Sequence, residues 1–260
     1  MVYNYPLVDR DQFIEIFQEM IEDGLVIAQQ TVQCTRSDFP ADQWIQNCLL
    51  IRGEGQMGKT RLINEFFYIA LRNKHISSLC FSLSLKDSKK PFSAVSLCIS
   101  RPLGFTETIT TATRQNRMKL YLREHRLEQH LSLLNEILGT SFNETPATAA
   151  LSPAEKDAAR KELFRFLCQK TFQNLWVLII DDAEFMDDES FDLFDVIWEM
   201  PQIITVLTVG YQKRLSPVRV RVLDSPHVCQ VKLPPIETLL HKAVACQFLN
   251  VNAIPLDLER

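Results

Sequence analysis

Three of the seven glycines in this 260-residue chain fall within six positions. They belong to Gly53-Glu-Gly-Gln-Met-Gly58-Lys59-Thr60, a segment that matches the pattern G-x-x-x-x-G-K-[ST] at every fixed position. The apolar segment Cys48-Leu-Leu-Ile-Arg52 precedes it and predicts a strand. A helix is predicted after it, from apolar residues at helical spacing: Leu62, Ile63, Phe66, Phe67, Ile69 and Ala70. Because strand, glycine turn and helix follow one another, the segment predicts a phosphate-binding loop.

Each part of this loop has a separate expected role. Its glycines permit backbone conformations in which successive N–H groups turn toward phosphate oxygens, and the helix adds the positive end of its dipole. Lys59 would reach the β and γ phosphates as a mobile point charge, and Thr60 would give its hydroxyl to Mg²⁺. The nucleotide-binding residues expected from the loop are Gly53, Glu54, Gly55, Gln56, Met57, Gly58, Lys59, Thr60 and Arg61.

A second segment, Val177-Leu-Ile-Ile-Asp181-Asp182-Ala-Glu184, predicts a buried strand that ends in acids. Ligands bind at the carboxyl ends of parallel strands, so Asp181 would lie beside the phosphate loop if the two strands are near neighbours. We expect Asp181 to hold the Mg²⁺ shell with Thr60, through water. Asp182 is the first candidate to orient or deprotonate attacking water, and Glu184 is the second. The alternative is that the two aspartates only cap the following helix.

Five apolar segments predict strands at 48–52, 77–85, 175–180, 203–209 and 228–233, with helical patterns between them. This alternation indicates an α/β fold with a five-stranded parallel sheet, helices on both faces and right-handed crossovers. We expect a P-loop NTPase domain over 1–235 with a helical insertion at about 90–172, and the start of a truncated helical lid over 236–260.

The insertion is expected to contain two long helices and a loop. The amphipathic segment 118–138 predicts one helix and 154–168 predicts another. Residues 139–153 are rich in Ser, Thr, Asn and Pro and predict a mobile loop. His125 and His130 are five positions apart, not the four that place two ligands on one helix face, so both are expected at the surface.

Composition excludes several classes of protein. The formal net charge is −4, and Glu124 interrupts the basic stretch from Arg114 to Arg126, so a nucleic-acid partner is not expected. The longest strongly apolar stretch, Leu175 to Ile180, is too short to cross a membrane, and no secretory signal opens the chain. Seven scattered cysteines without a Cys-x-x-Cys pair suggest neither a disulfide framework nor a zinc site. A cytoplasmic protein is expected.

Four short segments resemble the signal-transduction P-loop ATPases, the STAND branch of the AAA-like proteins. The first is the apolar strand ending in Asp-Asp-Ala-x-x-x-Asp at 181–187. Pro6-Leu-Val-Asp-Arg10 resembles the family's opening Leu-Val-Gly-Arg, with Asp9 in place of glycine. Lys90-Pro91-Phe92 resembles its Pro-Phe segment, and Val231-Lys-Leu-Pro-Pro235 resembles the turn before its lid. Within the family, the chain is similar to the NTPase region of the soluble (type 10) adenylate cyclases.

The resemblance implies ATP with Mg²⁺, and the sequence has no Asn-Lys-x-Asp guanine signature. It implies that Arg10 lies near the nucleotide, and that the partner is the rest of a larger signalling polypeptide. No paired metal-binding aspartates of a cyclase domain are evident, so cyclase chemistry is not expected here. For the polar residue that senses the γ-phosphate in relatives, Thr208, Gln212 and Arg214 are all candidates.

Three functions therefore stay open. The first is an ATP-dependent regulatory switch with slow or no turnover. The second is an active AAA-like ATPase that remodels a protein or nucleic-acid partner. The third is a scaffold that binds no nucleotide. ATP binding separates the third from the others, and turnover separates the first two.

Overall fold

The computed structural model describes residues 7–33, 46–106, 108–123, 128–210 and 216–253. Its five strands form one sheet in the order β2-β3-β4-β1-β5, and all neighbouring strands run parallel. The strands are β1 (Cys48–Arg52), β2 (Ile76–Ser82), β3 (Leu175–Asp181), β4 (Ile203–Val209) and β5 (Val228–Lys232). The predicted five-stranded parallel sheet is confirmed. The second strand is shorter than predicted, because the chain turns after Ser82.

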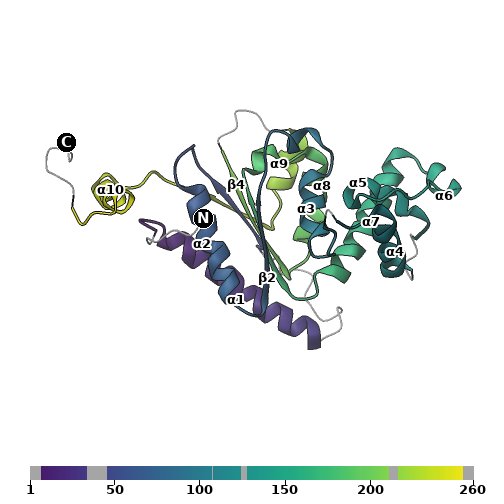
Figure 1. The fold of residues 1–260 in the computed structure, drawn as a ribbon, viewed down its shortest axis with the longest axis horizontal. Coiled ribbons are helices and arrows are strands. Elements are labelled where there is room, and N and C mark those ends of the chain that lie inside the picture. The colour runs from purple at the N-terminus through teal and green to yellow at the C-terminus, as the bar shows by residue number, and fades with distance from the viewer. Residues whose placement is uncertain (1–6, 34–45, 107, 124–127, 211–215, 254–260) are drawn as a thin grey trace.

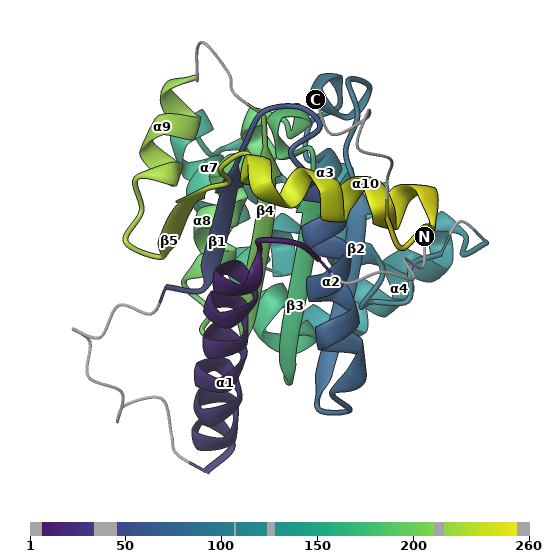
Figure 2. The ribbon, with the colours of Figure 1, turned by 90° about the vertical axis from the view of Figure 1, so that its left-hand side faces the viewer.

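Helices cover both faces of this sheet (Figures 1 and 2). On one face lie α1 (Asp11–Gln33) and α2 (Lys59–Arg72), and on the other α3 (Ser93–Ser100), α7 (Pro153–Thr171), α8 (Asp188–Trp198) and α9 (Pro217–Leu223). Alternate residues of β1 serve the two layers. Leu49 and Ile51 pack with α1 and α2, whereas Cys48 and Leu50 belong to the opposite cluster. A strand buried on both faces has a continuous apolar run in its sequence, and this run is what predicts β1.

The connections that leave β1 and β4 pass to opposite faces of the sheet. The chain leaves β1 through α2, and it leaves β4 toward α9 on the other face. These two strands are neighbours, and open α/β sheets bind ligands at the carboxyl ends of strands whose connections diverge in this way. The glycine-rich segment begins at this point, immediately after β1.

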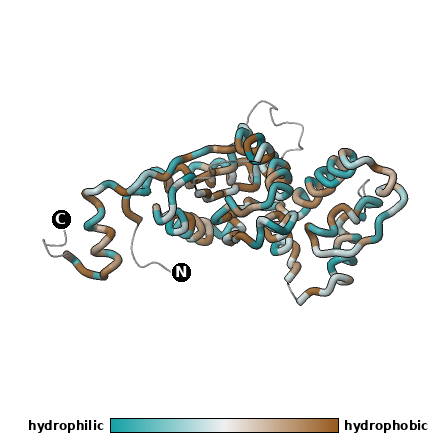
Figure 3. Tube along the Cα trace, turned by 90° about the horizontal axis from the view of Figure 1, so that it is seen from above, coloured by the Kyte–Doolittle hydropathy of each residue, from teal (hydrophilic) through white to brown (hydrophobic). Residues whose placement is uncertain are grey.

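The insertion lies beyond the layer of α3 and α8, on the side of the sheet away from α1 and α2, and has more breaks than predicted (Figures 1 and 3). It contains α4 (Thr111–Leu122), η3 (Glu128–Leu134), α5 (Asn135–Leu138) and α6 (Pro146–Ala149) before α7. The prediction of one helix over 118–138 is wrong, since α4 ends at Leu122 and His130 has non-helical backbone angles. The segment 139–153, predicted as a loop, contains α6.

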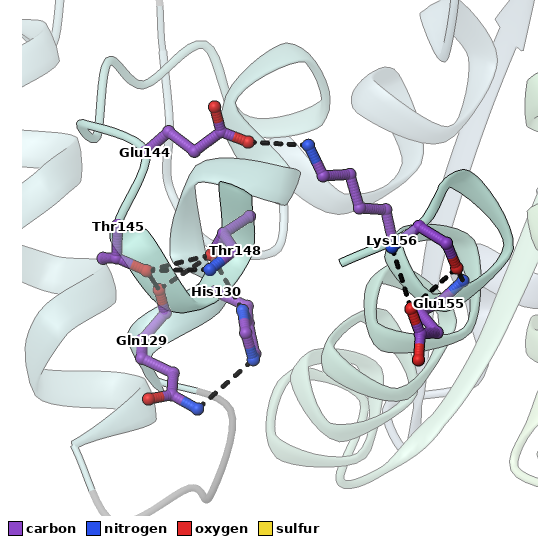
Figure 4. Close-up of polar contacts among 8 residues, drawn as sticks. Gln129, His130, Glu144, Thr145, Thr148, Glu155 and Lys156 are labelled. Carbon is purple, nitrogen blue, oxygen red and sulfur yellow. Dashed lines mark hydrogen bonds and ion pairs between the residues drawn. The ribbon is translucent and has the colours of Figure 1, made fainter. Parts of the chain in front are cut away.

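His130 explains part of this difference. It is 5% exposed, so the prediction of a surface histidine is wrong for this residue, while His125 lies outside the described residues. Its Nδ1 lies 2.8 Å from Thr148 Oγ1, and Thr145 donates to the backbone oxygen of Gln129 at 3.0 Å (Figure 4). These hydrogen bonds hold α6 against η3. Helical periodicity does not reveal them, because they join side chains from separate segments.

The chain after β5 leads away from the sheet. A short helical turn, η5 (Thr238–Leu240), is followed by α10 (His241–Leu249), which lies at the opposite end of the molecule from the insertion (Figures 1 and 3). No residue of α10 is buried, and Phe248 is 89% exposed. The segment expected to begin a helical lid, 236–260, thus contains a helix that starts at His241. Within the described ranges, no helix has the length and apolar character needed to span a membrane.

Candidate nucleotide site

The glycine-rich segment forms an open loop between β1 and α2. Gly58 is the N-cap residue of α2 and has a φ of 84°, a left-handed conformation that strains any residue with a Cβ. Gly53 has a different constraint, because a Cβ there would lie 3.2 Å from Leu233 Cβ. Gly55 has neither constraint, since its φ is not positive and no described atom lies within 4 Å of the place that a Cβ would take. The two glycines fixed by the pattern are thus the two at which a Cβ would be constrained, by the backbone angle at Gly58 and by the contact with Leu233 at Gly53.

This difference gives a test with a matched control. Gly58→Ala is expected to lower the free energy of unfolding by about 1–2 kcal/mol, the cost of a left-handed residue with a Cβ. Gly55→Ala adds the same methyl group to the same loop and should change it by less than about 0.5 kcal/mol. Urea denaturation of both variants measures the two values. Equal losses would contradict the backbone assigned to the loop.

The loop presents donors toward solvent at the start of α2. Within the described residues no side chain caps this helix, and the first N–H groups of any helix lack intrahelical acceptors. Lys59 Nζ donates to the backbone oxygens of Gly53 and Glu54, both at 2.9 Å. In a trans peptide the C=O and N–H groups point in opposite directions. The carbonyls that face Lys59 therefore direct the N–H groups of the next residues away from it.

Acidic and hydroxyl side chains from two strands and from α2 meet beside this loop. Thr60 Oγ1 donates to Asp181 Oδ2 at 2.7 Å, although the two residues are 121 positions apart. Thr208, near the end of β4, donates to Asp181 Oδ1 and accepts the Asp182 N–H at 3.0 Å. β4 lies between β1 and β3, so it supplies this link across the gap. Asp181 itself is buried. The parallel sheet, its flanking helices and this loop are consistent with a P-loop NTPase fold.

The two acids predicted for catalysis lie in different surroundings. Asp182 has a φ of 55°, is partly exposed, and accepts a hydrogen bond from Ser82 Oγ at 3.3 Å. Burial raises the pKa of Asp182, and the charges of Asp181 and Glu184 add to this shift. Glu184, in η4 (Ala183–Phe185), lies against the end of β4. Its Oε1 is 2.8 Å from the position that a Cβ on Gly210 would take.

A third acid, Asp187, performs the helix capping that the aspartate pair was alternatively expected to provide. It is the N-cap residue of α8, and its carboxylate accepts from the N–H and the hydroxyl of Ser190 at 2.8 and 2.7 Å. The same carboxylate accepts from the backbone N–H of Phe92 at 2.8 Å and that of Ser93 at 3.0 Å. Asp187 therefore joins α8 to the start of α3, and the aspartate pair remains at the phosphate loop.

Arg10 lies beside the phosphate loop, but its guanidinium binds backbone oxygens of the protein and is not exposed for a nucleotide. Its side chain is buried and donates to the backbone oxygens of Asp9, Met57 and Pro234. Burial lowers the pKa of Arg10, and the nearby Asp9 carboxylate opposes this shift. Asp9 has a φ of 59°, the conformation that the glycine of the similar motif adopts readily. Arg10 therefore lies near the loop, as the resemblance implied, while its side chain binds protein carbonyls.

Some of the other predicted site residues have described contacts, and others lie outside the described residues. Arg61 forms an ion pair with Glu65 at 3.4 Å along α2. Gln212 and Arg214 lie outside the described residues, whereas Thr208 contacts Asp181 directly. Sequence reasoning did not select Ser82, whose only signal was a polar residue at the end of an apolar strand.

No family model and no curated protein matches the chain. The chain is similar to a structure of the Aeropyrum pernix ORC1 protein in complex with DNA, with 14% identity and a TM-score of 0.46 over 94% of this chain and 50% of that one. It is also similar to Drosophila ORC bound to AT-rich DNA and Cdc6, with 13% identity and a TM-score of 0.33 over 91% and 66% of the two chains.

The chain spans less than two thirds of the first of these structures, and just under two thirds of the second. At these TM-scores neither similarity indicates an activity or a partner for this chain. Neither protein is a cyclase, so the expected relation to the soluble adenylate cyclases gains no support from them.

Proposed function

We propose that the chain is an ATP-binding P-loop module that acts as a nucleotide-dependent regulatory switch. The observation that carries this proposal is the hydrogen bond between Thr60 and Asp181, at 2.7 Å. It joins the start of α2 to the end of β3, two strands away from the loop's own strand. A hydroxyl and a carboxylate held together beside an open loop of backbone donors suit a phosphate and its magnesium ion.

The residues present fit Mg-ATP. Oxygen donors are the ligands that Mg²⁺ prefers, and Thr60 and Asp181 supply two of them. Bound Mg²⁺ would neutralise charge on the phosphate oxygens. Lys59 would exchange its two carbonyl contacts for phosphate oxygens, and the exposed amides of the loop would surround them.

Calorimetric titration with ATP in the presence of Mg²⁺ tests the proposal. Lys59→Ala is expected to weaken ATP binding by about tenfold or more, since one charge-assisted hydrogen bond contributes about 1.5–3 kcal/mol. Lys74→Ala removes an exposed lysine beyond the other end of α2 and should leave the affinity unchanged. A wild-type chain that binds no ATP would refute the proposal and leave the scaffold function.

A second candidate function is an active AAA-like ATPase that remodels a protein or nucleic-acid partner. It is favoured by Asp182, which projects a partly exposed carboxylate next to Asp181 with a hydrogen bond from Ser82. A raised pKa brings a carboxylate closer to neutral pH, where a general base for attacking water is most effective. Glu184 remains the alternative acid. Mg-ATP turnover above background would favour this function over the switch.

The wider setting is proposed on the resemblance alone. The module would belong to a larger cytoplasmic signalling polypeptide related to the soluble adenylate cyclases. Its NTPase domain would comprise residues 1–235 with the insertion at about 90–172, and 236–260 would begin a lid. The full reading frame around this segment tests that setting, because cyclase homology domains on either side would support it.

A further inference from the structure

Arg10 connects three segments that are distant in sequence. Its guanidinium lies 2.6 Å from Asp9 O, 3.4 Å from Met57 O and 3.0 Å from Pro234 O. Met57 belongs to the phosphate loop, and Pro234 to the linker that leads from β5 to α10. The residue is only 2% exposed, and burying a guanidinium is costly unless its donors find acceptors. The three carbonyls supply those acceptors.

Asp9 adds a second attachment to the same linker. Its Oδ2 accepts the backbone N–H of Glu237 at 3.4 Å. The dipeptide is fixed in turn by α1, because the Arg10 carbonyl accepts the N–H of Phe13 at 3.1 Å. Phe13 and the rest of the apolar face of α1 pack against the sheet. The linker is thus tied at two points to an anchored part of the fold.

The contact with Met57 bears directly on phosphate binding. Met57 O and Gly58 N–H belong to the same peptide unit and point in opposite directions. A guanidinium on the carbonyl side therefore favours the orientation in which the Gly58 N–H points away from Arg10. The positive charge also polarises this peptide group and strengthens its N–H as a donor.

We propose that Arg10 is a positioning residue that orients the Met57–Gly58 peptide and joins the phosphate loop to the α10 linker. ATP in the loop would thereby restrain the linker. This inference rests on the proposed function for its nucleotide-dependent part, but the physical connection between loop and linker does not depend on ATP.

Hydrogen–deuterium exchange of the whole chain tests the connection without nucleotide. Arg10→Gln is expected to speed amide exchange about tenfold in two segments, as one charge-assisted hydrogen bond is lost: at the end of the loop, where Leu62 N–H donates to Gly58 O, and in the linker, 236–240, where Glu237 N–H donates to Asp9. Arg221→Gln removes an exposed arginine and should change neither segment. Unchanged exchange in either segment would overturn the connection. So would exchange that becomes faster by the same factor across the whole chain, with no larger change in these two segments.

Titration with Mg-ATP tests the rest. In the wild type, saturating ATP should slow exchange in both segments, whereas in Arg10→Gln it should slow only the loop, with affinity about tenfold weaker. Linker protection by ATP in the variant would overturn the proposal. If Arg10→Gln does not fold, Arg10→Lys, which keeps the charge but not the three-way contact, takes its place. A wild type that binds no ATP would refute the proposed function, while the nucleotide-free exchange would still decide the connection.

Discussion

Asp187→Ala is expected to lower the free energy of unfolding by about 3 kcal/mol or more, because buried donors on two helices lose their acceptor. The carboxylate accepts five hydrogen bonds, from the N–H groups of Phe92, Ser93 and Ser190 and from the hydroxyls of both serines. Water cannot easily replace it, since Asp187 is 5% exposed. Urea denaturation measures the loss.

Two further variants test whether that loss of stability comes from the hydrogen bonds that the Asp187 carboxylate accepts. Asp187→Asn keeps one acceptor oxygen and should lose less stability than the alanine variant. Asp157→Ala removes a largely exposed aspartate paired with Arg160 and should cost less than about 1 kcal/mol. If Asp187→Ala and Asp157→Ala have similar effects, Asp187 does not join α3 to α8.

Asp181→Asn is expected to weaken Mg-ATP binding by about a hundredfold, which corresponds to about 2.7 kcal/mol for the charge lost at the metal. The amide has nearly the same size as the carboxylate, and the hydroxyls of Thr60 and Thr208 can reorient to accept from it. The fold should therefore persist. Calorimetry with and without Mg²⁺ should show that magnesium no longer strengthens ATP binding in this variant.

Asp182→Asn is the matched control, since it removes the same charge one residue later. It should keep the Mg²⁺-dependent part of the affinity, because Thr60 donates to Asp181, whereas Asp182 accepts its hydrogen bond from Ser82. If the wild type hydrolyses ATP, turnover in this variant should fall about a hundredfold or more, the range for a lost general base. Equal loss of Mg²⁺ dependence in both variants would contradict the assignment of the metal site to Asp181.

The sheet could be predicted from the sequence because its signals are local. β1 and β4 are short apolar runs that match their predicted bounds, and α7 begins at a Ser-Pro sequence that caps it. The strand order could not be predicted in the same way, since no local pattern states that β4 lies between β1 and β3. The prediction for the insertion was wrong for a similar reason. Its breaks depend on contacts such as that between His130 and Thr148.

For the candidate site too, local sequence signals predict some features, and contacts between distant segments determine the others. A motif indicated the loop, and an acidic strand end indicated Asp181, but only the folded chain shows that Thr60 and Thr208 donate to this carboxylate. The buried contacts of Arg10 had no sequence signal beyond a resemblance. They require β5 to lie beside β1, so that Pro234 comes close to Met57.

The loop between β2 and α3 is fastened at both ends to the segment that carries the acids. Leu83 N–H donates to Asp181 O at 3.0 Å, and the N–H groups of Phe92 and Ser93 end on Asp187. The connection between β2 and α3 is therefore held by hydrogen bonds at both of its ends. A shift of residues 181–187 would move the start of α3 with it.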